Sequence, residues 1–175
     1  MGARPLRTAL RLVVVIGLTL LVQTTVVLDI RIDGVSPDIM YLLPIVAGLV
    51  GGSIDGALVG FVAGLAADLL LPTPFGLTAL VGTLVGFAVG GLSGNVARDV
   101  RGFSTLVALA ASAVAVMLYA VLGAIIGQDQ FLHVDLAVVL PVVAVTNAIL
   151  AGPAVVVCRW ALAPSSDRQQ AAGRW

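Results

Sequence analysis

Charged residues are rare in this chain, and they divide it into long uncharged stretches. Nine basic and nine acidic residues make up 10% of the 175 positions, whereas a soluble domain carries about 25%. Six uncharged runs lie between them: Leu12–Leu28, Ile39–Ile54, Gly56–Ala67, Leu69–Ala97, Gly102–Gln128 and Leu136–Cys158. Because a helix needs about 17–25 mostly apolar residues to cross a bilayer, this pattern predicts an integral membrane protein.

Composition excludes several other classes of protein. An apolar content of 60% rules out a disordered chain, and the single Cys158 rules out both a disulfide scaffold and a thiolate metal cluster. A net charge of zero argues against nucleic-acid binding. An outer-membrane β-barrel would need short segments that alternate in hydrophobicity, and the uncharged runs are too long and too uniformly apolar for that.

We therefore predict an all-α polytopic membrane protein with one domain over residues 1–163 and a short cytoplasmic tail over 164–175. Its six short transmembrane helices are expected at about residues 8–28, 38–54, 55–71, 77–96, 103–127 and 135–160. Proline and glycine mark the breaks between helices. The Ser36–Asp38 segment offers an N-cap and a proline for the second helix, and the Pro72–Gly76 segment predicts a turn before the fourth.

The second and third helices leave alternatives open. Residues 38–71 give two short spans of about 17 residues each. The same stretch could instead form one long tilted helix or a re-entrant pair. Two spans are favoured because Gly51 and Gly52, followed by Ser53 and Asp55, would be a poor helix centre in lipid.

The arginines predict the orientation. With the N-terminus in the cytoplasm, six spans leave only Arg31 outside. The other eight are then cytoplasmic: Arg4, Arg7, Arg11, Arg98, Arg101, Arg159, Arg168 and Arg174. This split satisfies the positive-inside rule, so both termini are expected in the cytoplasm.

Glycines recur at a spacing of four residues along three predicted helices. They are Gly48 and Gly52 on the second helix, Gly56, Gly60 and Gly64 on the third, and Gly82, Gly86, Gly90 and Gly94 on the fourth. In lipid, such spacing lets helix backbones approach closely. The pattern favours packing of these three helices against one another, and the alternative is a groove that binds a partner's membrane helix.

Asp68 is the one carboxylate that interrupts an apolar segment well inside a predicted span. An acid within a membrane is a functional candidate by default. The alternative places Asp68 near the outer interface, where it would brace the turn containing Pro74 and Gly76 by accepting backbone N–H groups. Other polar residues in the spans, including Gln23, Tyr119 and Asn147, are expected to form hydrogen bonds between helices.

The residues needed for catalysis are missing. An intramembrane aspartyl protease needs two facing aspartates, and a serine protease of this kind needs a histidine within the membrane, whereas His133 is predicted in an outer loop. A metal site formed by His133 with Asp129 and Asp135 would be a poor one on a mobile loop. We expect no enzyme activity, no cofactor and no metal.

The order of motifs resembles the rod shape-determining protein MreD family. The segment Gly60–Leu70 reads GFVAGLAADLL, and the segment Pro74–Leu80 reads PFGLTAL. A glycine-rich helix that ends in Asp-Leu-Leu, then a proline turn, then Gly-Leu and Ala-Leu at the start of the next helix is similar to that family. Length and the six expected spans agree with it over essentially the whole chain.

The resemblance implies a non-enzymatic subunit of the bacterial cell-wall elongation complex in the inner (plasma) membrane. Its implied partner is MreC, a single-span protein with a periplasmic domain, within a wider complex of MreB, RodA and a class B penicillin-binding protein. The family also resembles the six-helix S components of energy-coupling-factor vitamin transporters, which supplies an alternative function. Ala9, Val13 and Gly17 make a poor version of the small-residue pattern that S components carry on their first helix.

Overall fold

The computed structural model describes residues 3–27, 38–70, 74–93, 102–127 and 136–172. The regular elements within these ranges are all helical: α1 (Ala3–Val22), a π-helical turn (Gln23–Val27), α2 (Leu42–Gly51), α3 (Ser53–Leu70), α4 (Leu77–Ser93), α5 (Phe103–Ile125) and α6 (Leu136–Ala172). The all-helical prediction is therefore confirmed for the described part of the chain.

Helix α2 begins later than expected. The sequence predicted its start at residue 38, but it begins at Leu42. The Asp38 carboxylate accepts the Met40 N–H at 2.9 Å, which holds a local turn of the type that competes with a helix start. Pro44 then occupies the first helical turn, where its missing N–H costs nothing. The two residues expected to assist Asp38, Ser36 and Pro37, lie outside the described residues.

Gly52 separates α2 from α3. Its φ of +93° lies in the left-handed region that favours glycine, and its N–H donates to the Gly48 carbonyl at 3.0 Å. The alternative of one long helix over residues 38–71 is therefore wrong. At about 1.5 Å per residue, α2 is only about 15 Å long, too short to cross a bilayer core of about 30 Å by itself.

Helix α6 is longer than expected. It was predicted to end near residue 160, with a separate tail from 164, but it continues past Pro164 to Ala172. The last five residues of the extension, RQQAA over 168–172, are good helix formers. Helix α4 is described as far as Ser93, and its predicted end at residue 96 lies outside the described residues. Helix α5 ends slightly earlier than predicted, at Ile125 instead of residue 127. Gly127, with a φ of +85°, follows α5 and turns the chain.

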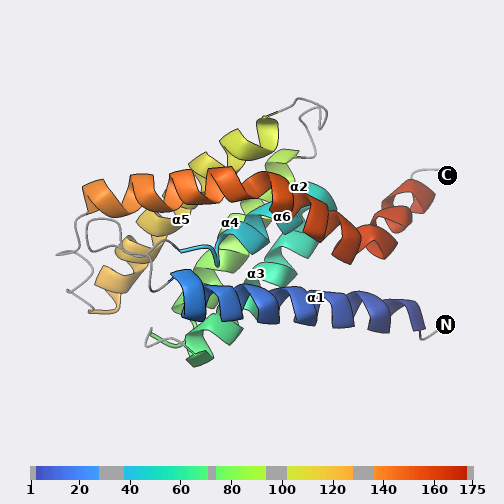
Figure 1. The fold of residues 1–175 in the computed structure, drawn as a ribbon, viewed down its shortest axis with the longest axis horizontal. Coiled ribbons are helices and arrows are strands. Elements are labelled where there is room, and N and C mark those ends of the chain that lie inside the picture. Colours follow the sequence, from blue (N-terminus) through green and yellow to red (C-terminus); the bar gives the residue numbers. More distant parts are fainter. Residues whose placement is uncertain (1–2, 28–37, 71–73, 94–101, 128–135, 173–175) are drawn as a thin grey trace.

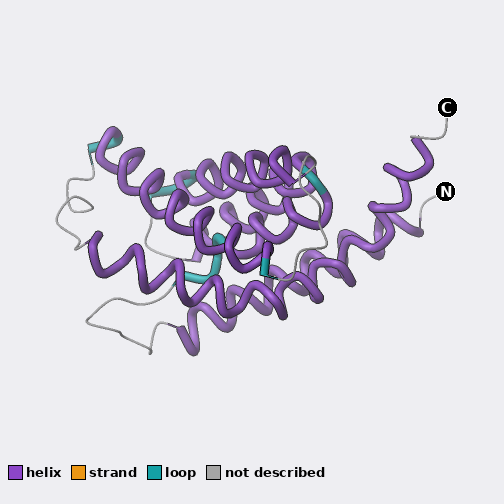
Figure 2. The backbone as a smooth tube through the Cα atoms, turned by 90° about the horizontal axis from the view of Figure 1, so that it is seen from above, coloured by secondary structure: helices purple, strands orange, loops and turns teal. Residues whose placement is uncertain are grey.

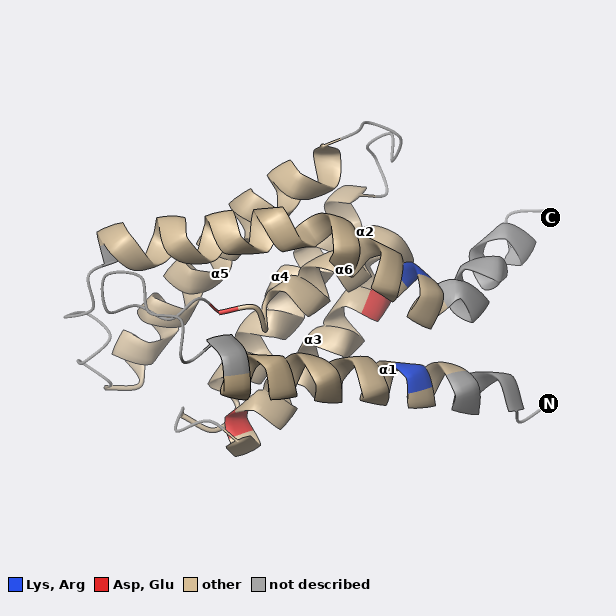
Figure 3. Cartoon of the chain, viewed as in Figure 1, with Lys and Arg blue, Asp and Glu red and all other residues tan. Residues whose placement is uncertain are grey.

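Successive helices run in opposite directions, so the two ends of the chain lie at the same end of the molecule (Figure 1). Seen from above, α1 and α6 lie side by side along one face of the bundle (Figure 2). The described basic residues lie on these two helices, toward the end that carries both termini (Figure 3). The two termini lie at the same end because the described chain passes through the bundle six times, an even number.

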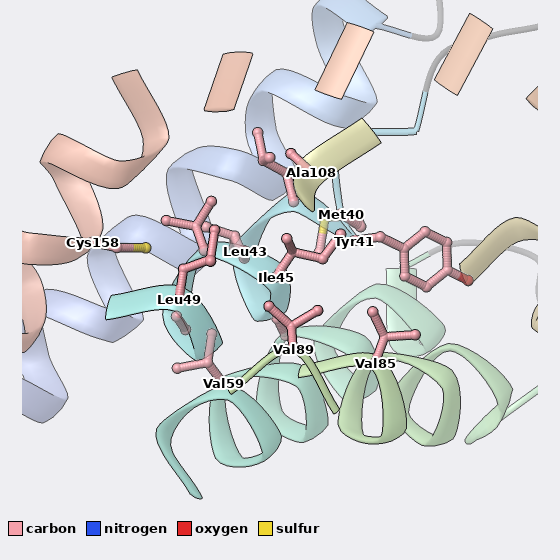
Figure 4. Close-up of a cluster of buried hydrophobic side chains, with 14 of the residues drawn as sticks. Met40, Tyr41, Leu43, Ile45, Leu49, Val59, Val85, Val89, Ala108 and Cys158 are labelled. Carbon is pink, nitrogen blue, oxygen red and sulfur yellow. The ribbon is translucent and has the colours of Figure 1, made fainter. Parts of the chain in front are cut away.

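The core forms around α2. Residues Leu42–Leu49 are all buried, because α3, α4, α5 and α6 each pack against this helix. Figure 4 shows Ile45 and Leu49 of α2 among side chains from the surrounding helices. The innermost of the described α-helices is thus the shortest, and the longer helices cover most of its surface.

The outer surface is apolar. Within the described residues, four helical segments are long and apolar enough to cross a membrane: Thr8–Thr25, Ser53–Leu70, Phe103–Ile125 and Ala137–Leu162. Large apolar side chains on these helices point outward, including Leu58 and Phe61 of α3 and Leu106 of α5, each at least half exposed. Exposed apolar surface of this extent requires a lipid environment, so the chain is a membrane protein.

Candidate functional site

The glycines of α3 and α4 face one another in pairs. A methyl group added to Gly60 would collide with the carbonyl group of Gly82. One added to Gly56 would collide with the carbonyl oxygen of Gly86, and the reverse substitution at Gly86 would meet the carbonyl oxygen of Gly56. The two backbones are therefore in direct contact, as close-packed helices in lipid require.

The contact continues toward the α3–α4 turn. A methyl group on Gly64 would lie 2.5 Å from the Ala79 Cα atom and 2.6 Å from the Thr78 carbonyl oxygen. Each glycine of α3 thus lies against a different turn of α4, in antiparallel order. This seam joins α3 to α4 from Gly56 to Gly64.

Helix α2 packs into the same seam. A methyl group on Gly48 would lie 2.6 Å from the Gly86 carbonyl oxygen and 3.0 Å from the Gly90 nitrogen. A methyl group on Gly90 would collide with the Gly52–Ser53 segment, where the chain turns between α2 and α3. Eight of the glycines singled out from the sequence are buried here: Gly48, Gly52, Gly56, Gly60, Gly64, Gly82, Gly86 and Gly90. Gly94 lies outside the described residues.

Asp68 connects the end of α3 to the start of α4. Its Oδ2 atom accepts the N–H groups of Gly76 at 2.9 Å and Ala79 at 3.3 Å, and the side chain is 6% exposed. Gly76 directly precedes α4 and Ala79 lies in its first turn, where N–H groups have no partner within the helix. A carboxylate there also lies at the positive end of the helix dipole. Asp68 therefore has the contacts that the turn-bracing alternative requires.

The turn itself is closed by backbone contacts. Pro74 offers its carbonyl to the Leu77 N–H at 3.1 Å. Gly76 has a φ of +90°, a conformation that other residues adopt only at a cost. Phe75 lies between them and is 69% exposed. The turn is thus fixed from inside the bundle by Asp68 and presents an aromatic ring on its outer side.

Aromatic and polar side chains from other helices gather near Asp68. Tyr41 and Tyr119 lie beside Thr78, and the two tyrosine rings meet edge to face with centroids 6.4 Å apart. Tyr41 precedes α2 and Tyr119 belongs to α5. The group therefore ties the start of α2 to α4 and α5.

A second polar contact group lies between α5 and α6. The Asn147 Nδ2 atom donates to the Ser112 Oγ atom at 2.9 Å and to the Asp38 carbonyl at 3.0 Å. The Gln23 side chain accepts the Ile39 N–H at 3.1 Å, so the segment before α2 is also held by the π-helical turn that follows α1. Asn147 and Ser112 are completely buried. The sequence analysis did not predict a contact for Ser112. The signal available was its place on the small-residue face of α5 that includes Ala108 and Ala115.

The polar groups described above position helices relative to one another. Within the described ranges, no three acidic, histidine or cysteine side chains come together as a potential metal site. Cys158 is buried in the core. The site considered at His133, Asp129 and Asp135 lies outside the described residues.

Comparison with known proteins adds one match. The family model described as rod shape-determining protein MreD matches residues 5–160. Neither the curated proteins nor the solved structures gave a match. The matched region begins in α1 and ends in α6, so it includes the glycine seam, the Asp68 turn and both polar contact groups. The chain therefore belongs to the MreD family of rod shape-determining proteins.

Proposed function

We propose that this chain is a non-enzymatic scaffold subunit of the cell-wall elongation complex that binds an MreC-like single-span protein. Membership of the MreD family over nearly the whole chain carries the proposal, since that family acts in rod shape determination. Through this partner the chain would join MreB, RodA and a class B penicillin-binding protein. The polar side chains described above support a scaffold, because they hold the helices of this chain together.

The surface we assign to the partner is the outer side of the α3–α4 turn. Leu69, Leu70 and Phe75 are all exposed there, between 64% and 69% of their full area. The turn lies at the end of the bundle opposite the termini (Figure 1). With both termini in the cytoplasm, this end faces the periplasm, where a partner with a periplasmic domain would approach. The glycine seam offers no such surface, since its glycines are buried against this chain's own helices.

Co-purification tests this proposal. The full chain, extracted gently from membranes that also contain an MreC-like protein, should retain that partner in a fixed ratio. Phe75→Ala should reduce the recovery of the partner without reducing the amount of the chain, because Phe75 makes its contacts outside the bundle. Recovery of a stoichiometric vitamin and no partner would contradict the proposal and favour the S-component alternative, which the family match does not support.

We also propose that the chain lies in the inner (plasma) membrane with both termini in the cytoplasm. The arginine distribution and the common location of the two termini support this orientation. A reporter that is active only in the periplasm, fused after Trp175, should therefore give no signal. The same reporter inserted between α1 and α2 should be active. Periplasmic activity of the C-terminal fusion would show that the orientation is wrong.

A further inference from the structure

A groove between α1 and α6 lies on the described surface, and the scaffold role does not use it. It has a volume of about 320 Å³ and is almost entirely apolar. Its walls are Val15, Leu18 and Val22 of α1 and Pro153 and Val157 of α6, with Leu43 of α2 at its floor. Leu18 and Val157 are 58% and 43% exposed, so the groove is open to the surrounding lipid.

A cation and an aromatic ring lie about one helical turn beyond the residues that line one end of this groove. The Arg11 Nη1 atom donates to the Trp160 carbonyl at 3.1 Å, and the guanidinium lies 4.7 Å from the centre of the Trp160 ring. Arg11 follows the same stripe of α1 as Val15, Leu18 and Val22, because residues spaced by three and four share a helix face. Trp160 shares a face of α6 with Pro153 and Val157 for the same reason.

The depth of the groove matches one leaflet. Arg11 and Val22 are about 16 Å apart along α1 at a rise of about 1.5 Å per residue, and half of a bilayer core is about 15 Å. The cation therefore lies at headgroup depth when the apolar walls lie at acyl-chain depth. Trp160, with 54% of its area exposed, occupies the interfacial position that tryptophan favours in membranes.

The size of the groove favours an acyl chain over a helix. A transmembrane helix is about 10 Å across with its side chains, so a 16 Å length of it would occupy on the order of 1,200 Å³. That exceeds all of the empty space in the groove, which is about 840 Å³ when its open side is included. The Thr19 hydroxyl on the α1 wall donates to the Val15 carbonyl at 2.9 Å, so it does not need a polar partner from the occupant.

We propose that this groove binds one anionic phospholipid of the leaflet that faces the termini. One acyl chain lies between α1 and α6 on the floor formed by α2, and the phosphate lies beside Arg11 and Trp160. A guanidinium has five N–H donors in a planar arrangement, and the bond to the Trp160 carbonyl uses one of them. The others provide the geometry that phosphate oxygens need. The bound lipid would fill the space between the first and last helices.

Native mass spectrometry of the full chain in mild detergent tests the proposal, with added phosphatidylglycerol or phosphatidylcholine as the probe. The wild-type chain should retain one phosphatidylglycerol more tightly than one phosphatidylcholine. Arg11→Gln should weaken phosphatidylglycerol binding about fivefold, because one arginine contributes roughly 1 kcal/mol to binding near an anionic surface. Arg159→Gln is the matched control, since Arg159 lies on the opposite face of α6 from the groove, and it should leave binding unchanged.

A second pair of variants tests the acyl-chain site independently of the charge. Leu18→Trp fills the groove and should reduce retention of both lipids, whereas Val13→Trp, on the opposite face of α1 and also exposed, should not. Equal retention of the two lipids by wild type and all four variants would overturn the proposal. So would loss of an MreC-like partner in Leu18→Trp with lipid binding intact, because the groove would then be a partner site. The isolated chain is sufficient for the lipid measurement, so a failed scaffold function would not affect it.

Discussion

Gly60→Ala should lower the free energy of unfolding by about 1–3 kcal/mol, the usual cost of overpacking a close-packed interior. The added methyl group would collide with the Gly82 carbonyl group, and backbone cannot rotate aside as a flexible side chain can. Helix propensity alone would raise the free energy of unfolding, because alanine is the better helix former by about 1 kcal/mol. A decrease would therefore report the collision with α4. Unfolding in mixed micelles with increasing sodium dodecyl sulfate, followed by circular dichroism, measures the change.

Gly17→Ala is the matched control for this substitution. Gly17 also lies within a transmembrane helix, but a methyl group added there meets no atom within 4 Å. The control should keep or slightly raise the stability of the wild type. Gly60→Leu and Gly86→Leu should abolish accumulation of the folded protein, since their side chains add more bulk to the same seam. Equal stability of Gly60→Ala and Gly17→Ala would show that α3 and α4 are not in backbone contact.

Asp68→Asn should destabilise the chain by about 1–3 kcal/mol, because a charge-assisted contact to two backbone N–H groups becomes neutral. The substitution keeps the size of the side chain and one acceptor oxygen, but it removes the negative charge at the start of α4. The amount of the chain in membranes should fall accordingly. Quantitative blotting of membrane fractions measures this amount, and co-purification measures the recovery of the partner.

The two measurements separate the possible roles of Asp68. Bracing of the turn predicts a lower amount of the chain, with partner recovery per chain unchanged. Direct docking predicts an unchanged amount of the chain, with lower partner recovery per chain. Phe75→Ala, which alters the exposed side of the same turn, serves as the comparison for docking. If Asp68→Asn changes neither quantity, the carboxylate is a tolerated interfacial charge and the site assignment is wrong.

The helices could be predicted from the sequence because charge, proline and glycine mark their ends. Helix α3 was predicted to begin at residue 55 and begins at Ser53, directly after Gly52, since glycine with positive φ ends one helix before the next begins. The start of α2 could not be predicted in the same way. Span prediction assumes that each helix matches the bilayer thickness, but α2 is surrounded by protein, so packing and the Asp38 turn determine its length.

Only part of the candidate site could be predicted from the sequence. Spacing by four residues identified the glycine faces of α3 and α4, but it could not pair Gly60 with Gly82 or Gly56 with Gly86. The contact between Asn147 and Ser112 joins residues on different helices, and neither belongs to a periodic pattern that indicates the other. Likewise, Arg11 contributed only to the charge count until the structure placed it against Trp160.

The arrangement of α2 inside its neighbours has a consequence for biogenesis. A helix of about 15 Å cannot remain in a bilayer alone, so α2 must leave the insertion machinery together with α3 and α4, whose glycines it contacts. These three helices are consecutive, and contacts close in sequence form first. Helix α1 is synthesised before them, yet its main helical neighbour is α6, the last to emerge. The bundle is therefore completed only when the final helix reaches the first.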